Sequence, residues 1–72
     1  MTRIDPAARA QVLWQAADEL DADRRAREAH HKHTYSKIGK VAAAHYSGMR
    51  EAVNFLRNQA RAADAEAHQE TA

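Results

Sequence analysis

Apolar residues recur at helical spacing along two long stretches of this 72-residue chain, and no stretch alternates apolar and polar residues as a half-buried strand would. Asp5-Pro6 favours a helix start, because Asp caps helices well and Pro fits the first helical position. One apolar stripe follows at spacings of three and four: Ala10, Leu13, Ala17 and Leu20. After Leu20 the larger apolar residues stop. The pattern predicts a first helix over about residues 6–28.

The second stretch carries a seven-residue repeat, which is the clearest pattern in the chain. Its members follow at steps of four and three: Ile38, Ala42, His45, Met49, Ala52, Leu56, Gln59 and Ala63. It predicts a second helix over about residues 36–65, with Thr34 or Ser36 as the cap. The histidine-rich segment over about 29–35 is the poorest helix former and is expected to be the connection. We expect the polar tail, about 66–72, to fray.

Gly48 leaves two interpretations of the second helix open. Glycine inside a helix costs roughly 0.5–1 kcal/mol relative to alanine, so its presence calls for an explanation. It either lets a continuous helix pack closely against the first helix, or it marks a turn that divides the second helix in two. The continuous helix is favoured.

The expected fold is therefore all-α, a two-helix antiparallel hairpin forming one small domain over residues 1–72. Alanine supplies 18 of the residues, so few large side chains are available for a core. The expected core consists of Leu13, Ala17, Leu20, Ile38, Met49, Val53 and Leu56. Because a chain this short buries only about 60% of its surface, we expect it to self-associate into a homo-oligomeric helical bundle.

Positive charge gathers around the predicted connection. Residues 24–40 carry six lysines and arginines against Glu28 alone, a net charge of 6 − 1 = +5, although the whole chain carries only +1. Such a cluster is typical of a contact with phosphate or with an acidic partner. The alternative is a solvated loop whose cations favour the helix dipole. The candidate contact residues are Arg24, Arg25, Arg27, Lys32, Lys37 and Lys40.

Aromatic residues are a second class of candidate. Trp14, Tyr46 and Phe55 are candidates for an exposed apolar contact, because aromatic side chains often anchor interfaces. They could equally be residues at the edge of the core.

Catalytic and metal-binding signatures are missing from the sequence. There is no cysteine, no glycine-rich phosphate loop and no nucleophile elbow. His30, His31 and His33 could approach one metal ion, but no second ligand cluster accompanies them. We therefore expect no metal, no cofactor and no enzymatic activity.

The favoured function is that of an adaptor, a protein that binds another protein or itself. The alternative is a small DNA-binding regulator, because residues 38–57 resemble a helix-turn-helix with Gly48 near the turn. Nucleic acid would then be bound through the basic tip. The alanine-, arginine- and aspartate-rich composition resembles that of short accessory proteins of high-GC actinobacteria and their phages or plasmids. No apolar run is long enough to cross a bilayer, so a cytoplasmic location without membrane contact is expected.

Overall fold

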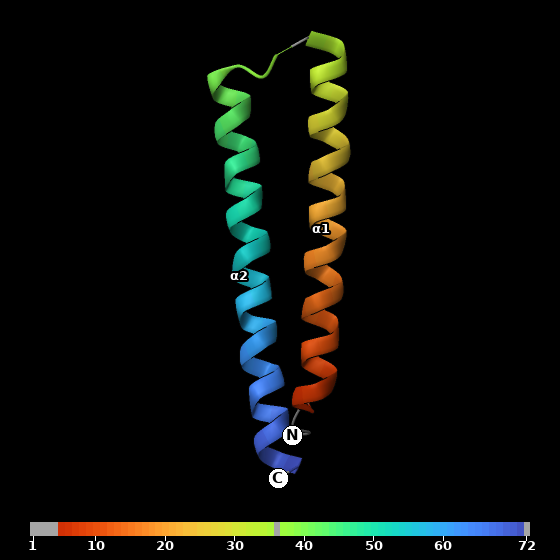
Figure 1. Ribbon diagram of the computed structural model, residues 1–72, viewed down its shortest axis with the longest axis vertical. Coiled ribbons are helices and arrows are strands. Elements are labelled where there is room, and N and C mark those ends of the chain that lie inside the picture. Colours follow the sequence, from red (N-terminus) through yellow and green to blue (C-terminus); the bar gives the residue numbers. More distant parts are fainter. Residues whose placement is uncertain (1–4, 36, 72) are drawn as a thin grey trace.

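The chain folds as two long helices packed side by side in opposite directions. The computed structural model describes residues 5–35 and 37–71. Helix α1 spans Pro6–Tyr35 and helix α2 spans Lys40–Thr71, and the start of α1 and the end of α2 lie at the same end of the hairpin (Figure 1). The molecule measures 52 × 24 × 16 Å. The prediction of an all-α, two-helix hairpin is confirmed.

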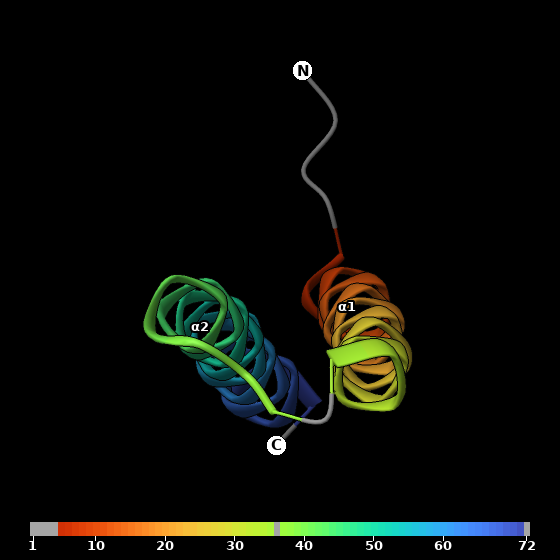
Figure 2. The ribbon, with the colours of Figure 1, turned by 90° about the horizontal axis from the view of Figure 1, so that it is seen from above.

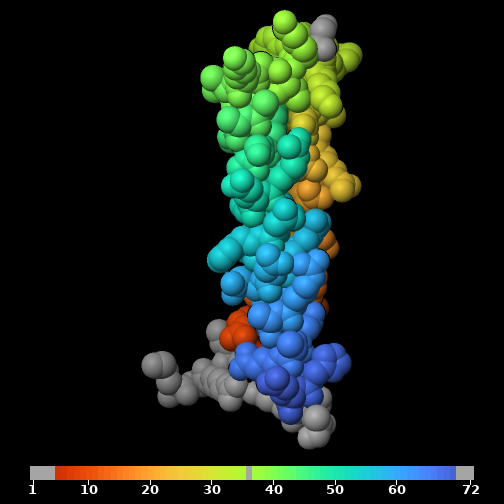
Figure 3. Space-filling view, turned by 60° about the vertical axis from the view of Figure 1, so that its left-hand side comes forward, coloured from red at the N-terminus to blue at the C-terminus, as the bar shows by residue number. Residues whose placement is uncertain are grey.

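The two helices run side by side along their whole length. Seen from the hairpin end, α1 and α2 form a single layer (Figure 2). In the space-filling view α2 covers the full length of the molecule, with part of α1 visible behind it (Figure 3). Every tertiary contact between elements is therefore a contact between these two helices.

Helix α1 starts where the sequence predicts it. The carbonyl oxygen of Asp5 accepts a hydrogen bond from the Arg9 N–H at 2.9 Å, which is the first helical bond. Its end differs from the prediction, because α1 continues to Tyr35 and so includes the histidine-rich segment assigned to the connection. No glycine or proline interrupts this segment. The alanines and arginines that precede it have high helix propensity, so the helix continues into it.

Helix α2 also differs from the prediction at both of its ends. It begins at Lys40, and the Gly39 carbonyl accepts the first helical bond, from the Ala43 N–H at 2.9 Å. The predicted cap Thr34 lies within α1, and Ser36 is outside the described residues. At the other end α2 extends to Thr71, so most of the tail expected to fray is helical.

The buried seam of α2 is rotated relative to the predicted one. His45, Ala52 and Gln59 are exposed, whereas the residue that follows each of them is buried: Tyr46, Val53 and Ala60. Ala42, Met49, Leu56 and Ala63 belong to both stripes, because both follow the same seven-residue repeat. The observed seam is the less polar of the two and is the one that faces α1.

Small side chains dominate the contact between the helices. The fully or nearly fully buried apolar residues are Ala10, Ala17, Tyr46, Val53, Ala60 and Ala63. Of the predicted core, Ala17 and Val53 are buried. The remaining five are only half-buried: Leu13, Leu20, Ile38, Met49 and Leu56. Alanine lets the helices approach closely but removes little apolar surface from water.

Gly48 lies within the uninterrupted helix α2 and is exposed. A Cβ built on it would meet nothing within 4 Å, so the glycine serves no close approach to α1. The continuous helix is confirmed, and close packing against α1 is not the reason for the glycine.

Replacing Gly48 by alanine should therefore raise the free energy of unfolding by roughly 0.5–1 kcal/mol, because alanine has the higher helix propensity and nothing obstructs its methyl group. Urea unfolding followed by circular dichroism at low micromolar concentration measures this change. Ala44→Gly, at another exposed position of α2, is the matched control and should lower stability by a similar amount. A destabilised Gly48→Ala variant would contradict the prediction.

Candidate interaction surfaces

The hairpin has two long flanks, and one of them is polar. On it, alternating steps of four and three residues bring together five side chains of each helix: Trp14, Asp18, Asp21, Arg25 and Glu28 from α1, and Arg50, Asn54, Arg57, Arg61 and Asp64 from α2. Contacts between the helices show that these rows share one side. The Arg57 guanidinium lies 3.9 Å from Asp18 and 3.6 Å from Asp21. We refer to this surface as the polar flank.

Asp21 is the centre of the polar flank and the only buried charged residue among those described. Its carboxylate accepts hydrogen bonds from the Arg24 guanidinium at 3.1 and 3.3 Å and lies 3.1 Å from Arg25. The hydrogen bond from Arg24 is the largest influence and holds the pKa of this carboxyl below its ordinary value of 3.8. Burial acts in the opposite direction, and the charges of Arg25 and Arg57 lower the pKa further.

Three of the six candidate cations are engaged in ion pairs within the hairpin. The side chain of Arg24 is only 12% exposed and bridges Asp21 and Glu28. Glu28 in turn accepts a hydrogen bond from Arg50 of α2 at 2.8 Å. Arg25 pairs with Asp21, and Arg27 pairs with Asp23 at 2.8 Å. The structure thus places these three arginines among carboxylates and away from the end of the hairpin.

Two of the three candidate aromatic residues tie the helices together. The Trp14 indole N–H donates a hydrogen bond to Asp64 at 2.8 Å, and the Arg61 guanidinium lies 5.7 Å from the ring centroid. Tyr46, expected as an exposed contact, is instead buried and donates its hydroxyl hydrogen to the Arg27 carbonyl at 3.2 Å. Phe55 is 62% exposed, so it alone of the three presents most of its ring to solvent.

The middle of the opposite side of the hairpin is apolar, between Arg9 at one end of α1 and the ion pair of Asp23 and Arg27 farther along it. The side chains of the polar flank occupy one side of each helix, so residues on the other side of both helices lie together on the opposite surface. These residues are Leu13, Ala16 and Leu20 of α1, and Met49, Ala52, Leu56, Gln59 and Ala63 of α2. We refer to this surface as the apolar flank. None of its members is charged, and its four large side chains are half-buried. Val12 and Phe55, 65% and 62% exposed, lie at its edges.

The closed end of the hairpin, residues 29–49, carries the other three candidate cations. Lys32, Lys37 and Lys40 lie there, and the segment contains no aspartate or glutamate. Within the part of the chain that the structure describes, none of these lysines makes an ion pair. We refer to this end as the tip.

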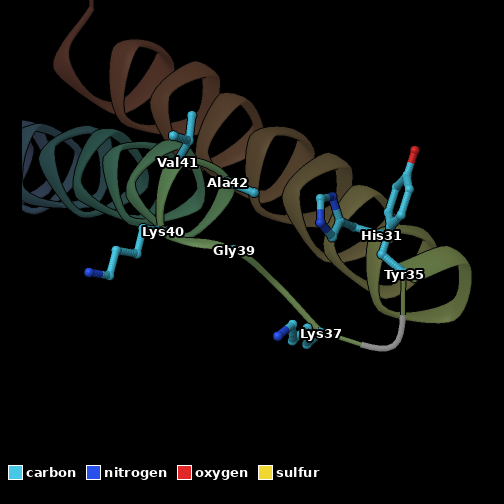
Figure 4. A pocket seen from close by; sticks show the side chains of 7 residues that line it. All are labelled: His31, Tyr35, Lys37, Gly39, Lys40, Val41 and Ala42. Atoms are coloured by element: carbon cyan, nitrogen blue, oxygen red, sulfur yellow. The ribbon is translucent and has the colours of Figure 1, made fainter.

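A hollow of about 520 Å³ opens at the tip, between the end of α1 and the start of α2 (Figure 4). Most of its wall is apolar, and it is lined by His31, Tyr35, Lys37, Gly39, Lys40, Val41 and Ala42. Two of its apolar lining residues are strongly exposed, with Tyr35 at 66% and Val41 at 87%. The tip therefore combines exposed apolar surface with lysines.

Two of the histidines of the tip, His31 and His45, pack against tyrosine rings. The His31 ring lies 4.9 Å from that of Tyr35 and 6.0 Å from that of Tyr46, and His45 lies 5.5 Å from Tyr46. Because α1 continues through the histidine-rich segment, its successive side chains point to different sides of the helix. Among the described residues, no group of three or more histidines and carboxylates is placed to hold a metal ion.

The resemblance of residues 38–57 to a helix-turn-helix does not extend to their conformation. Residues 40–57 belong to one uninterrupted helix, with no turn near Gly48. The arrangement in which a short second helix enters the major groove is therefore not formed by this segment.

No protein-family model matches the chain, and no curated protein or solved structure is detectably similar to it. Within residues 5–35 and 37–71, neither helix carries a stretch long and apolar enough to span a lipid bilayer.

The lowered pKa of Asp21 predicts a specific pH dependence of stability. The stabilisation it provides is fully present above the ordinary carboxyl value of 3.8 and is lost as the pH falls through the lower native value. Asp21→Asn should therefore be less stable than the wild type at neutral pH, and the difference between the two should shrink below about pH 3.8. Urea unfolding of both proteins, followed through Trp14 fluorescence, measures this difference.

Asp18→Asn is the matched control for this experiment. Asp18 is exposed and lies 3.9 Å from Arg57, so its loss should change stability much less at every pH. A stability difference between wild type and Asp21→Asn that stays constant down to acidic pH would contradict the assignment.

Proposed function

We propose that this protein is a non-enzymatic helical interaction protein that pairs with a second copy through the apolar flank. The observation that carries the proposal is the position of its large aliphatic side chains. Leu13, Leu20, Met49 and Leu56 all lie on one side of the hairpin and are only half-buried there. A second hairpin on this face would complete their burial and form a four-helix bundle.

The extended shape of the single hairpin supports this pairing. It exposes 5584 Å² of surface, whereas a compact monomer of 8.1 kDa exposes about 4,500 Å². Its radius of gyration is 16.3 Å, against about 11 Å for a compact domain of this length.

The composition of the apolar flank also suits helix packing. Its large side chains are separated by small ones, with Ala16 between Leu13 and Leu20 and Ala52 between Met49 and Leu56. Large and small residues that alternate along a face let a second helix interdigitate at normal packing density. The named members of this flank carry no charge that would have to be desolvated, and the charged residues on the same side of α1, Arg9, Asp23 and Arg27, lie toward its two ends.

Single charged substitutions test the pairing. Ala52→Glu and Phe55→Glu place a carboxylate on or beside the apolar flank at exposed positions, so each hairpin should still fold. Size-exclusion chromatography with light scattering should give the mass of two chains for the wild type and of one chain for both variants, because burying an unpaired charge is costly.

Ala65→Glu is the control, since Ala65 is exposed on α2 but away from the apolar flank. It should retain the mass of two chains. A wild type that has the mass of a single 8.1 kDa chain even at millimolar concentration would refute the pairing, as would Ala65→Glu being as disruptive as Ala52→Glu.

DNA binding remains a second candidate, supported only by the lysines of the tip. Three lysines can neutralise about three phosphates, so the logarithm of the binding constant should fall with the logarithm of salt concentration with a slope no steeper than about −3. Fluorescence anisotropy of a labelled duplex measures this slope. Arg25→Ala and Arg27→Ala should leave binding nearly unchanged, because both arginines are paired with carboxylates. A steeper slope that is reduced in these variants would contradict binding through the lysines alone, because it would mean that the arginines contact phosphate as well.

A further inference from the structure

We infer that the tip of the hairpin is a docking site for an acidic peptide segment that inserts an apolar side chain between the two helices. The site consists of the hollow lined by His31, Tyr35 and Val41, together with the neighbouring Lys37 and Lys40. It is separate from the apolar flank through which the second copy is proposed to bind, and the inference does not depend on that pairing.

The arginines and the lysines of the hairpin differ in whether they lie against a carboxylate. Six arginines of the described chain lie against a carboxylate of the same chain: Arg9, Arg24, Arg25, Arg27, Arg50 and Arg57. The three lysines of the tip have no such partner within the part of the chain that is described. Since residues 29–49 contain no carboxylate at all, negative charge for this end must come from another molecule or from small ions.

The apolar part of the site indicates what that molecule carries besides negative charge. Val41 is 87% exposed and Tyr35 is 66% exposed, next to a hollow of about 520 Å³ whose wall is mostly apolar. That volume is large enough for a side chain such as leucine or phenylalanine. In Figure 4 the His31 ring and the Ala42 methyl group lie between the helices, whereas Lys37 and Lys40 extend from the other side of the opening. An apolar side chain could thus enter while carboxylates on either side of it reach the lysines.

A peptide satisfies both parts of the site, and a simple polyanion satisfies only one. Phosphates of a nucleic-acid backbone would meet the lysines but leave Val41 and the hollow uncovered. Burial of apolar surface contributes roughly 25 cal/mol per Å² and adds to the charge contacts only when the ligand supplies an apolar group. An acidic segment with one large apolar residue is therefore the ligand that fits this end best.

The probe is a short synthetic peptide with one leucine flanked by glutamates, titrated into the ¹⁵N-labelled protein and followed by NMR. The chemical-shift changes should be confined to residues 31–42. Replacing the leucine of the peptide by serine, or its glutamates by glutamines, should weaken binding at least tenfold. The same loss is expected for the double variant Lys37→Gln, Lys40→Gln and for Val41→Ser.

The double variant Gln11→Glu, Gln69→Glu is the control, because it changes the net charge by the same amount at exposed positions far from the tip. It should bind the peptide like the wild type. A peptide that causes no shifts at the tip at millimolar concentration would overturn the inference. So would a serine peptide that binds equally well, or a labelled duplex or phosphatidylserine vesicles that bind the tip while the peptide does not.

Light scattering of the same variants separates this inference from the proposed pairing. The variants with substitutions at Lys37, Lys40 and Val41 should keep the mass of two chains. The variant Ala52→Glu, which is expected to be monomeric, should keep its affinity for the peptide. Loss of peptide binding with an intact dimer would refute only the tip site. A monomeric wild type that still binds the peptide would refute only the pairing.

Discussion

The contact between the two helices is lined mainly by alanine, and most features of the hairpin follow from that constraint. Ala10, Ala17, Ala60 and Ala63 are buried almost completely, and Val53 is the largest side chain that is fully buried. A seam of methyl groups lets two helices lie close together but supplies little hydrophobic stabilisation. The hairpin must therefore be held by other interactions as well.

Those interactions differ between the two sides of the seam. On the polar flank, Asp21 and Glu28 form ion pairs with arginines of both helices. The Trp14 indole N–H donates a hydrogen bond to Asp64. These contacts fix how α1 and α2 are aligned along their length. On the apolar flank the larger aliphatic side chains remain half-exposed. The polar groups of the polar flank are thus paired within the chain, whereas the apolar flank would bury more apolar surface if a second molecule packed on it.

Arginine and lysine are used for different purposes in this chain. Arginine forms planar, directional bonds to carboxylates, which suits contacts that hold a structure together. Each of the three candidate arginines lies against a carboxylate of the same helix, and Arg24 and Arg27 donate hydrogen bonds to theirs. The three candidate lysines lie at the tip, where residues 29–49 contain no carboxylate. Net charge over residues 24–40 groups all six as one basic patch because it leaves out Asp21 and Asp23. The spacing of three or four residues from these acids to the arginines is the signal that separates the arginines from the lysines.

The sequence by itself determined that the chain forms two helices in a hairpin and that the first begins at Asp5-Pro6, and it favoured a continuous second helix while leaving a turn at Gly48 open. These properties depend on local propensity and capping, which act within a few residues. Only the tertiary structure decided which side of α2 faces α1. Two stripes with the same seven-residue repeat, one through His45 and one through Tyr46, share half of their members and are related by a rotation of about 50° of the helix. The choice between them depends on the residues of α1 that pack opposite, and that information lies some twenty to fifty positions away along the chain.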